Sequence, residues 1–172
     1  CHQLNNQHTI QVERNNLDQK LSRSIYRWRM ESRHINAVGI WLYSKSTKRY
    51  LYLLRNDPKH PGAWGLAGGK SERGESLSDT IRRECTEELG TYPDVQKLIP
   101  IEHFTSADNK FIYHTFFGVL KEEFMPVLNN EHLGFAWIDS GHIPRPLHPG
   151  LWSTININEI QSKIKQIEKS IN

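Results

Sequence analysis

A run of glycine, glutamate and arginine residues at fixed spacing constrains this 172-residue chain more than any other feature. Five residues separate Gly69 from Glu75, and seven more precede an Arg-Glu-x-x-Glu-Glu-x-Gly segment. The specified positions are Gly69, Glu75, Arg83, Glu84, Glu87, Glu88 and Gly90. At average residue usage, such a match arises by chance on the order of once in a million chains of this length. The run is therefore a functional motif rather than an accident of composition.

The second half of the run has the features of an amphipathic helix. Ser76 and Ser78 are the two candidate N-cap residues, and Gly90 suits the position after the helix, where the backbone turns left-handed. Between them an apolar residue recurs at every fourth position, which predicts one buried stripe: Leu77, Ile81, Cys85 and Leu89. We expect the helix to pack on the rest of the protein along this stripe.

Three carboxylates border the stripe on one face of the predicted helix. Glu84, Glu87 and Glu88 share that face because their spacing is i, i+3 and i+4. A glutamate-rich helix face is usually just solvated. Arg82 and Arg83 could form salt bridges with them, but no lysine or arginine lies one turn further on, so a divalent cation accounts better for three neighbouring negative charges. All-oxygen ligands favour magnesium, with manganese as the alternative, over zinc.

A glycine pair precedes the helix. The segment Trp64–Lys70 predicts a short strand that enters a turn at Gly68 and Gly69. Glycines let the backbone approach a ligand closely. We expect them to free the Gly68 carbonyl to point at the metal.

Together, these residues resemble the Nudix box, which spans Gly69–Thr91 here and is the signature of hydrolases that cleave a nucleoside diphosphate linked to another group. Three positions depart from the usual pattern. Ala67 stands where proline is usual, and Cys85 and Thr91 stand where branched aliphatic residues are usual. These departures affect packing more than chemistry.

The resemblance implies roles for residues of the motif. The implied metal ligands are Gly68, Glu84, Glu87 and Glu88. Glu84 is also a candidate proton acceptor, and Arg83 would orient the glutamates by ion pairing. Gly69 would approach the substrate. Glu75, at the entrance of the helix, would support the metal site or cap the helix.

A further glutamate outside the motif is a candidate ligand and base. Glu131 lies six residues before Trp137, as in family members that resemble the mutator-protection enzyme, where this glutamate reaches the metal or activates water. The alternative is an exposed loop glutamate before a core strand. Glu122 and Glu123, near the end of the preceding predicted strand, are rivals for the same role.

Basic residues outside the motif offer weaker candidates. Arg55 ends a predicted strand where the same family places a phosphate-binding arginine, although a plain surface arginine is the alternative. The nine histidines are scattered without a two-histidine motif, so a zinc site is not expected. His132, beside Glu131, is a candidate for proton transfer. The proline-rich segment 144–151 either lines the substrate cleft through Arg145 or His148 or holds the final helix.

Hydrophobic patterning predicts an α+β protein. A hairpin is expected from strands at residues 37–43 and 49–55, and later strands are expected at residues 98–104, 110–120 and 135–138. A long closing helix is expected at residues 152–171. This order matches the Nudix fold, a mixed β-sheet sandwiched between helices, over residues 34–172. Residues 1–33 form a separate expected region, with a polar arm followed by an amphipathic helix whose apolar stripe is Leu17, Leu21, Ile25 and Trp28. That helix either packs on the sheet or forms a homodimer contact.

Composition limits the setting and the partners. The net charge of +3 and the pI near 8.9 suit an anionic small molecule, but the basic excess is too small for a stable nucleic-acid partner. The two cysteines argue against a disulfide scaffold, and no apolar run is long enough to span a membrane. We expect a cytoplasmic location and no membrane partner.

The expected reaction is divalent-metal-dependent hydrolysis of a pyrophosphate linkage. The spacing of Glu131 favours a (deoxy)nucleoside triphosphate, which would give a monophosphate and pyrophosphate. A nucleotide-sugar or ADP-ribose pyrophosphatase is the second enzyme hypothesis. A non-catalytic nucleotide-binding Nudix module is the third hypothesis; such modules usually lose carboxylates of the motif, whereas this chain keeps all of them.

Overall fold

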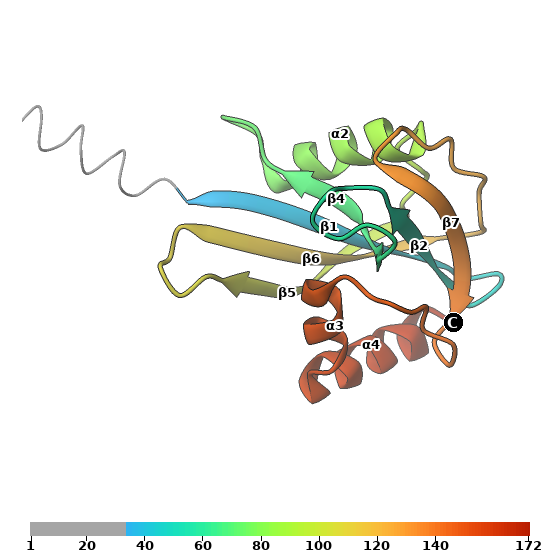
Figure 1. Ribbon diagram of the computed structural model, residues 1–172. Coiled ribbons are helices and arrows are strands. Elements are labelled where there is room, and N and C mark those ends of the chain that lie inside the picture. Colours follow the sequence, from blue (N-terminus) through green and yellow to red (C-terminus); the bar gives the residue numbers. More distant parts are fainter. Residues whose placement is uncertain (1–33) are drawn as a thin grey trace, which may run out of the picture. The chain divides into compact units, whose positions relative to one another are not determined.

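The expected hairpin lies at the centre of the sheet in this computed structural model, which describes residues 34–172 (Figure 1). β1 (Ile35–Ser44) and β2 (Arg49–Arg55) flank a turn in which Lys48 has a left-handed backbone, with a φ of 56°. Most residues of both strands are buried, because helices cover both faces of the sheet (Figure 1). The α+β class and the helix–sheet–helix layers are therefore confirmed.

Seven strands form this sheet within the described residues. The remaining five are β3 (Trp64–Gly65), β4 (Ala67–Lys70), β5 (Lys97–Thr105), β6 (Phe111–Leu120) and β7 (His132–Asp139). The strand order is β3-β2-β1-β6-β5, with β4 paired to β1 and β7 paired to β2. β1 and β6 run parallel, whereas all the other pairs are antiparallel, so the sheet is mixed as expected.

The two hairpin strands part soon after their turn. β1 pairs with β2 only at Tyr43–Tyr50 and Ser44–Arg49. Further from the turn, β1 pairs with β4, while β2 pairs with β3 and β7. The prediction of one strand entering a glycine turn over Trp64–Lys70 was therefore wrong. The segment is split because its two halves follow two neighbours that have separated.

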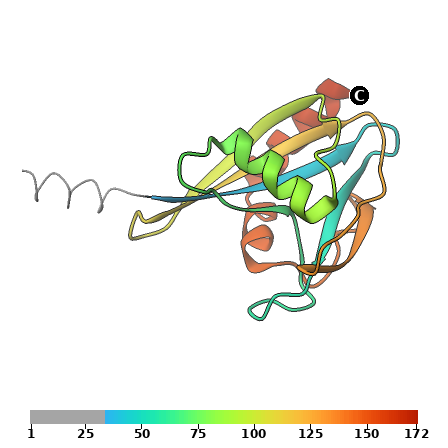
Figure 2. The same cartoon turned by 90° about the horizontal axis from the view of Figure 1, so that it is seen from above.

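Helices on opposite faces cover two distinct cores. α2 (Leu77–Leu89) lies over an aliphatic core, and seen from above it crosses the strands (Figure 2). α3 (Pro149–Ile155) and α4 (Asn158–Ile171) pack on the other face, against an aromatic core. The aromatic residues of that core are Trp41, Tyr43, Tyr50, Tyr52 and Phe117.

The C-terminal region differs from its prediction in two respects. The expected single helix over 152–171 is two helices, because Ile157 has an extended backbone and Asn156 donates a side-chain hydrogen bond to the Trp152 carbonyl at 2.7 Å. β7 is also longer than the expected strand over 135–138, since it pairs with β2 along the length of that strand.

The separate region expected at residues 1–33, including its amphipathic helix and dimer contact, lies outside the described residues. Among residues 34–172, the helices are too short or too polar to cross a membrane.

Candidate active site

Both ends of α2 are fixed by the residues that the sequence indicated. The Ser76 side chain accepts a hydrogen bond from the Asp79 amide at 3.1 Å, and the Asp79 carboxylate accepts one from the Ser76 amide at 3.3 Å. This capping box selects Ser76 over Ser78 as the N-cap. Gly90 ends the helix with a φ of 79°, which only glycine adopts without strain. Glu75 does not cap the helix, so that half of its prediction was wrong.

Arg83 gathers the carboxylates at the start and middle of α2. Its guanidinium donates to Glu75 at 2.7 Å, to Glu84 at 2.9 Å and to Glu87 at 3.3 Å. It also donates to the Lys70 carbonyl at 2.9 Å, which ties α2 to the end of β4. These bonds raise the pKa of Arg83, and the bond from Arg83 holds the pKa of Glu75 at about 2. The predicted ion pairing of Arg83 with the glutamates is present in the structure.

Glu84 lies directly against Gly69. Its side chain is buried, and a β-carbon at position 69 would overlap the Glu84 carboxylate. Burial raises the pKa of Glu84, although the neighbouring Arg83 opposes that shift. Glycine at position 69 is therefore what allows this carboxylate to reach the backbone of β4.

Glu88 is the most deeply buried carboxylate of the motif, with 3% of its surface exposed. It accepts a hydrogen bond from the Gly68 amide at 3.0 Å. Burial, followed by the charges of Glu84 and Glu131, raises the pKa of Glu88 to about 9. The Glu131 carboxylate lies within hydrogen-bonding reach of Glu88. Residues about forty positions apart in the sequence thus meet beside the Gly68 backbone of β4.

The backbone around Glu131 is held close to the end of β2. The Asn56 amide donates to the Glu131 carbonyl at 3.0 Å, and the Asn56 side chain donates to the Asn130 carbonyl at 3.1 Å. The Glu131 amide donates to the Asn129 side chain at 3.1 Å. The Glu131 side chain itself is exposed, so it approaches Glu88 from the solvent side.

The rivals of Glu131 are not in this cluster. Glu123 accepts hydrogen bonds from Arg49 at 2.6 and 2.8 Å and from Thr47 at 2.6 Å, at the turn between β1 and β2. Glu122 is exposed just after β6. Of the three candidates, only Glu131 contacts the helix carboxylates.

Arg55 lies among three histidines at the end of β2. Its guanidinium pairs with Asp57 at 2.5 Å. The rings of His60 and His148 meet edge to face, with centroids 4.7 Å apart. Burial and the nearby Arg55 charge lower the pKa of His132 to about 4 and also lower the pKa of His148. The three imidazoles and the Arg55 guanidinium form a polar group next to the loop that carries Glu131.

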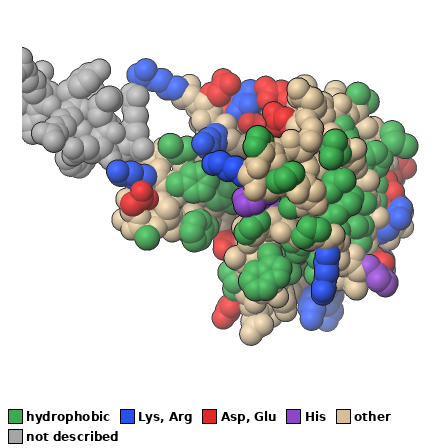
Figure 3. Space-filling view, in the orientation of Figure 1, with side chains coloured by type: hydrophobic (Ala, Val, Ile, Leu, Met, Phe, Trp, Pro, Cys, Tyr) green, Lys and Arg blue, Asp and Glu red, His purple; other side chains and the backbone are tan. Residues whose placement is uncertain are grey.

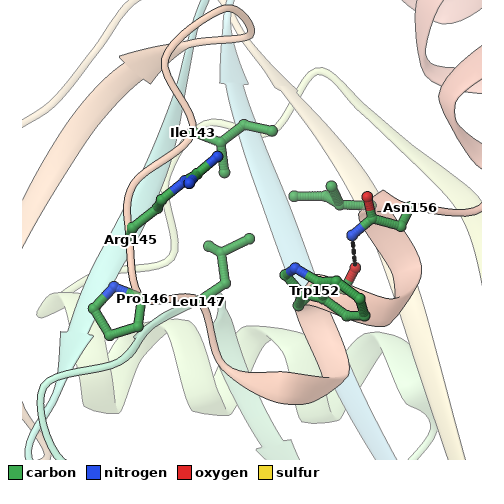
Figure 4. A pocket seen from close by; sticks show the side chains of 7 residues that line it. Ile143, Arg145, Pro146, Leu147, Trp152 and Asn156 are labelled. Atoms are coloured by element: carbon green, nitrogen blue, oxygen red, sulfur yellow. Dashed lines mark hydrogen bonds between the residues drawn. The ribbon is translucent and has the colours of Figure 1, made fainter.

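The proline-rich segment after β7 has two sides. The His148 amide donates to the Trp64 carbonyl, and the Trp64 amide donates to the Pro146 carbonyl, both at 2.8 Å, which joins this segment to β3. Arg145 instead lines a separate hollow of about 590 Å³, together with Trp152 on α3 and Asn156 at the end of that helix (Figure 4). Of the two candidate cleft residues, His148 is near Arg55 and Arg145 lies apart.

A comparison with known protein families identifies the kind of site that these residues form. Residues 33–156 match the model of the NUDIX domain family. The chain belongs to this family. The matched range contains β1–β7, α2 and every predicted site residue, whereas α4 lies beyond it.

Curated relatives of this Nudix protein include the nucleoside triphosphatase NudI of Escherichia fergusonii, which is 33% identical over 88 residues. The match covers 45% of this chain and 62% of that relative, so the chain spans under two thirds of the relative's length. The NudI protein of Shigella flexneri is 30% identical over the same length.

Solved structures share the fold. A MutT NUDIX hydrolase from Burkholderia pseudomallei has a TM-score of 0.59 at 18% identity, with 75% of this chain and 97% of that chain covered. The Nudix hydrolase RenU from M. smegmatis also has a TM-score of 0.59, at 17% identity, covering 82% and 88% of the two chains.

The acidic side chains at the Nudix site offer carboxylate oxygens, the ligand type that hard divalent cations prefer. All the acidic donors are oxygen atoms, and Glu88 and Glu131 approach each other as carboxylates do when a proton or a cation lies between them. Within residues 34–172, no three acidic, imidazole or thiol side chains already converge as a ligand set, and the Glu84 and Glu87 oxygens face Arg83 instead. Acidic side chains gather along the upper rim of the molecule, over α2 (Figure 3).

Two residues that lie beside Gly68 were not singled out in the sequence. Tyr113, on β6, extends over β1 and contacts Gly39. Gly39 offered a signal, because a glycine inside an otherwise apolar strand marks a close approach. Nothing in the sequence indicated which side chain makes that approach.

Proposed function

We propose that this Nudix protein hydrolyses the pyrophosphate linkage of a nucleoside diphosphate derivative. The favoured substrate is a (deoxy)nucleoside triphosphate, with a monophosphate and pyrophosphate as products. The similarity to proteins named nucleoside triphosphatase supports the choice of substrate. The approach of Glu131 to the motif supports it as well, since the spacing of this residue suggested a triphosphate.

One observation carries the proposal. Glu88 is buried against the Gly68 amide, with Glu131 beside it and its pKa raised to about 9 by burial and neighbouring charge. Burying a carboxylate without a cationic partner lowers the stability of the folded protein. The single hydrogen bond from the Gly68 amide only partly offsets that cost, whereas a bound cation would stabilise the charged carboxylate.

Magnesium, or manganese in its place, is the proposed cofactor. Its ligands would be Glu84, Glu87, Glu88 and Glu131, with the Gly68 carbonyl. When bound, such an ion neutralises phosphate oxygens and lowers the pKa of water. The role of the Gly68 carbonyl remains a prediction, because the recorded contact of Gly68 to this cluster is made by its amide.

The side chains divide the remaining tasks. Arg83 holds Glu84 and Glu87 in place, and Glu75 fixes Arg83 from the other side. Glu131 or Glu84 accepts the proton from the attacking water. Arg55 binds a phosphate, because a planar guanidinium matches phosphate geometry. Because Gly69 has no side chain, the substrate and the Glu84 carboxylate can both approach its backbone.

A nucleotide panel with product analysis tests this function. Purified protein is incubated with nucleoside triphosphates, nucleotide sugars and ADP-ribose, with magnesium or with excess chelator, and products are separated by ion exchange. We expect monophosphate and pyrophosphate from a triphosphate, and no turnover with chelator. Faster cleavage of a nucleotide sugar or ADP-ribose would replace the substrate proposal. Binding without turnover of any compound would make the protein a nucleotide-binding module.

A further inference from the structure

Three glycines meet where β1 and β4 pair. Gly39 lies opposite Gly68 in the register, and Gly69 follows on the same strand. A β-carbon at Gly68 would overlap the Val38 carbonyl, so this glycine allows the two strands to approach. At Gly39 and Gly69, side chains from elsewhere in the chain occupy the space that a β-carbon would fill. At Gly69 this side chain is the Glu84 carboxylate.

The group at Gly39 is the Tyr113 hydroxyl. β6 runs parallel to β1, with Tyr113 aligned to Ala37, so the Tyr113 ring must lean across β1 to reach Gly39. A β-carbon on Gly39 would overlap the hydroxyl and would lie 2.9 Å from the ring carbon Cζ. The hydroxyl therefore ends next to the Gly39–Gly68 pair, and the Gly68 amide holds Glu88.

The surroundings of this hydroxyl belong to the active site. Burial, together with the Glu88 charge, raises the pKa of Tyr113 to about 12, and the Arg55 charge opposes this shift. The hydroxyl thus lies within the fields of a proposed metal ligand and a proposed phosphate ligand. It stays protonated at physiological pH. Within residues 34–172, it forms no hydrogen bond, so its proton is available to a ligand.

We propose that the Tyr113 hydroxyl contacts the substrate and donates a hydrogen bond to a phosphate oxygen between the α2 carboxylates and Arg55. This inference rests on the proposed function, since the ligand is the phosphate chain of the nucleotide. A neutral donor suits this place, because it binds an anionic oxygen without competing with the cation for the carboxylates. Because Gly39 has no side chain, the Tyr113 ring can cross β1 at this position.

Steady-state kinetics of Tyr113→Phe test the contact, with the triphosphate that wild-type protein hydrolyses fastest. Hydrogen bonds to charged groups are strong enough that we expect kcat/KM to fall roughly 10- to 100-fold. Most of the loss should be in KM, because the phosphate oxygen is already charged in the ground state. The melting temperature should stay within about 2 °C, as the hydroxyl has no protein partner to lose. Tyr92→Phe is the matched control, since Tyr92 lies against Arg82 and should leave kinetics unchanged.

A double-mutant cycle tests the route through Gly39. Gly39→Ala should lower kcat/KM as much as Tyr113→Phe does, because the new methyl group must displace the ring. In a Tyr113→Ala background, Gly39→Ala should have no further effect. Wild-type kinetics in Tyr113→Phe, or independent losses in the cycle, would overturn the proposed contact. If wild-type protein hydrolyses no nucleotide, the proposed function fails first, so the two failures are distinguishable.

Discussion

Beneath α2 the sheet presents aliphatic side chains, whereas beneath α3 and α4 it presents aromatic rings. The two faces also treat polar groups differently. On the aromatic face, the Tyr50 hydroxyl donates to Glu168, and the Tyr43 hydroxyl accepts a hydrogen bond from Asn172 at 2.8 Å. On the α2 face, the Glu84 and Glu88 carboxyl groups are buried, and burial raises the pKa of each.

The polar groups on the two faces therefore have opposite effects on the stability of the folded protein. The aromatic face joins the end of the chain to the sheet, and its polar contacts stabilise the folded state. The α2 face buries Glu88, whose raised pKa of about 9 means that burial disfavours its charged form. We therefore expect substitutions on the α2 face to change activity, and substitutions beneath α4 to change stability alone.

The largest expected effect is on turnover by Glu88→Gln. The amide keeps the shape of the side chain and can still accept the Gly68 hydrogen bond, but it removes the ligand charge. Turnover should fall by several tens-fold to thousands-fold, as when other essential catalytic groups are lost. Glu87→Gln should behave similarly. Near-normal turnover in a folded Glu88→Gln protein would show that α2 is merely a structural helix.

A core truncation beneath α4 should give the opposite result. Ile160 is buried on α4, so Ile160→Ala should lower the free energy of unfolding by about 2–5 kcal/mol and leave turnover per folded molecule unchanged. Ile81→Ala, at a buried position on α2, should lower both quantities because it shifts the carboxylates. Denaturant unfolding and kinetics on the same samples measure both. Equal kinetic losses in the two variants would remove the distinction between the faces.

The structure also shows how far the sequence could carry the prediction of this site. The caps and the apolar stripe of α2 depend on contacts between residues close in the sequence. The sequence could therefore predict Ser76 as one of two N-cap candidates and Gly90 as the end of the helix. The division of Trp64–Lys70 into two strands was not visible, because it depends on where β1 and β2 separate. Tyr113 escaped detection for the same reason, since only the parallel pairing of β6 with β1 brings it to Gly39.

Glu131 and Glu123 form a matched pair for substitution, because Glu131 contacts Glu88 whereas Glu123 pairs with Arg49. Glu131→Gln should lower kcat by roughly 10- to 100-fold with little change in substrate binding, because proton removal matters only as the transition state forms. Glu123→Gln should leave kcat unchanged, since this residue pairs with Arg49. If Glu123 proved essential and Glu131 did not, the triphosphate-type proposal would give way to the nucleotide-sugar hypothesis.

The smallest expected effect concerns stability and pH in the presence of chelator. The pKa of Glu88 is raised to about 9 in the folded chain, above its value in the unfolded chain. Between these values the unfolded chain releases a proton that the folded chain retains, so stability falls as pH rises. Relative to Glu88→Gln, wild-type protein should lose roughly 1–2 kcal/mol of stability between pH 6 and pH 8. Thermal melts at both pH values measure this difference, and parallel curves would contradict it.

Manganese binding, followed by electron paramagnetic resonance of the free ion, tests most directly whether the α2 face holds a divalent cation. Wild-type protein and Glu159→Gln, which alters an exposed glutamate on α4, should bind manganese equally. Glu88→Gln should bind it at least about tenfold more weakly, and excess magnesium should displace it. Equal manganese affinity in all three proteins would contradict a cation site at the buried carboxylates of α2.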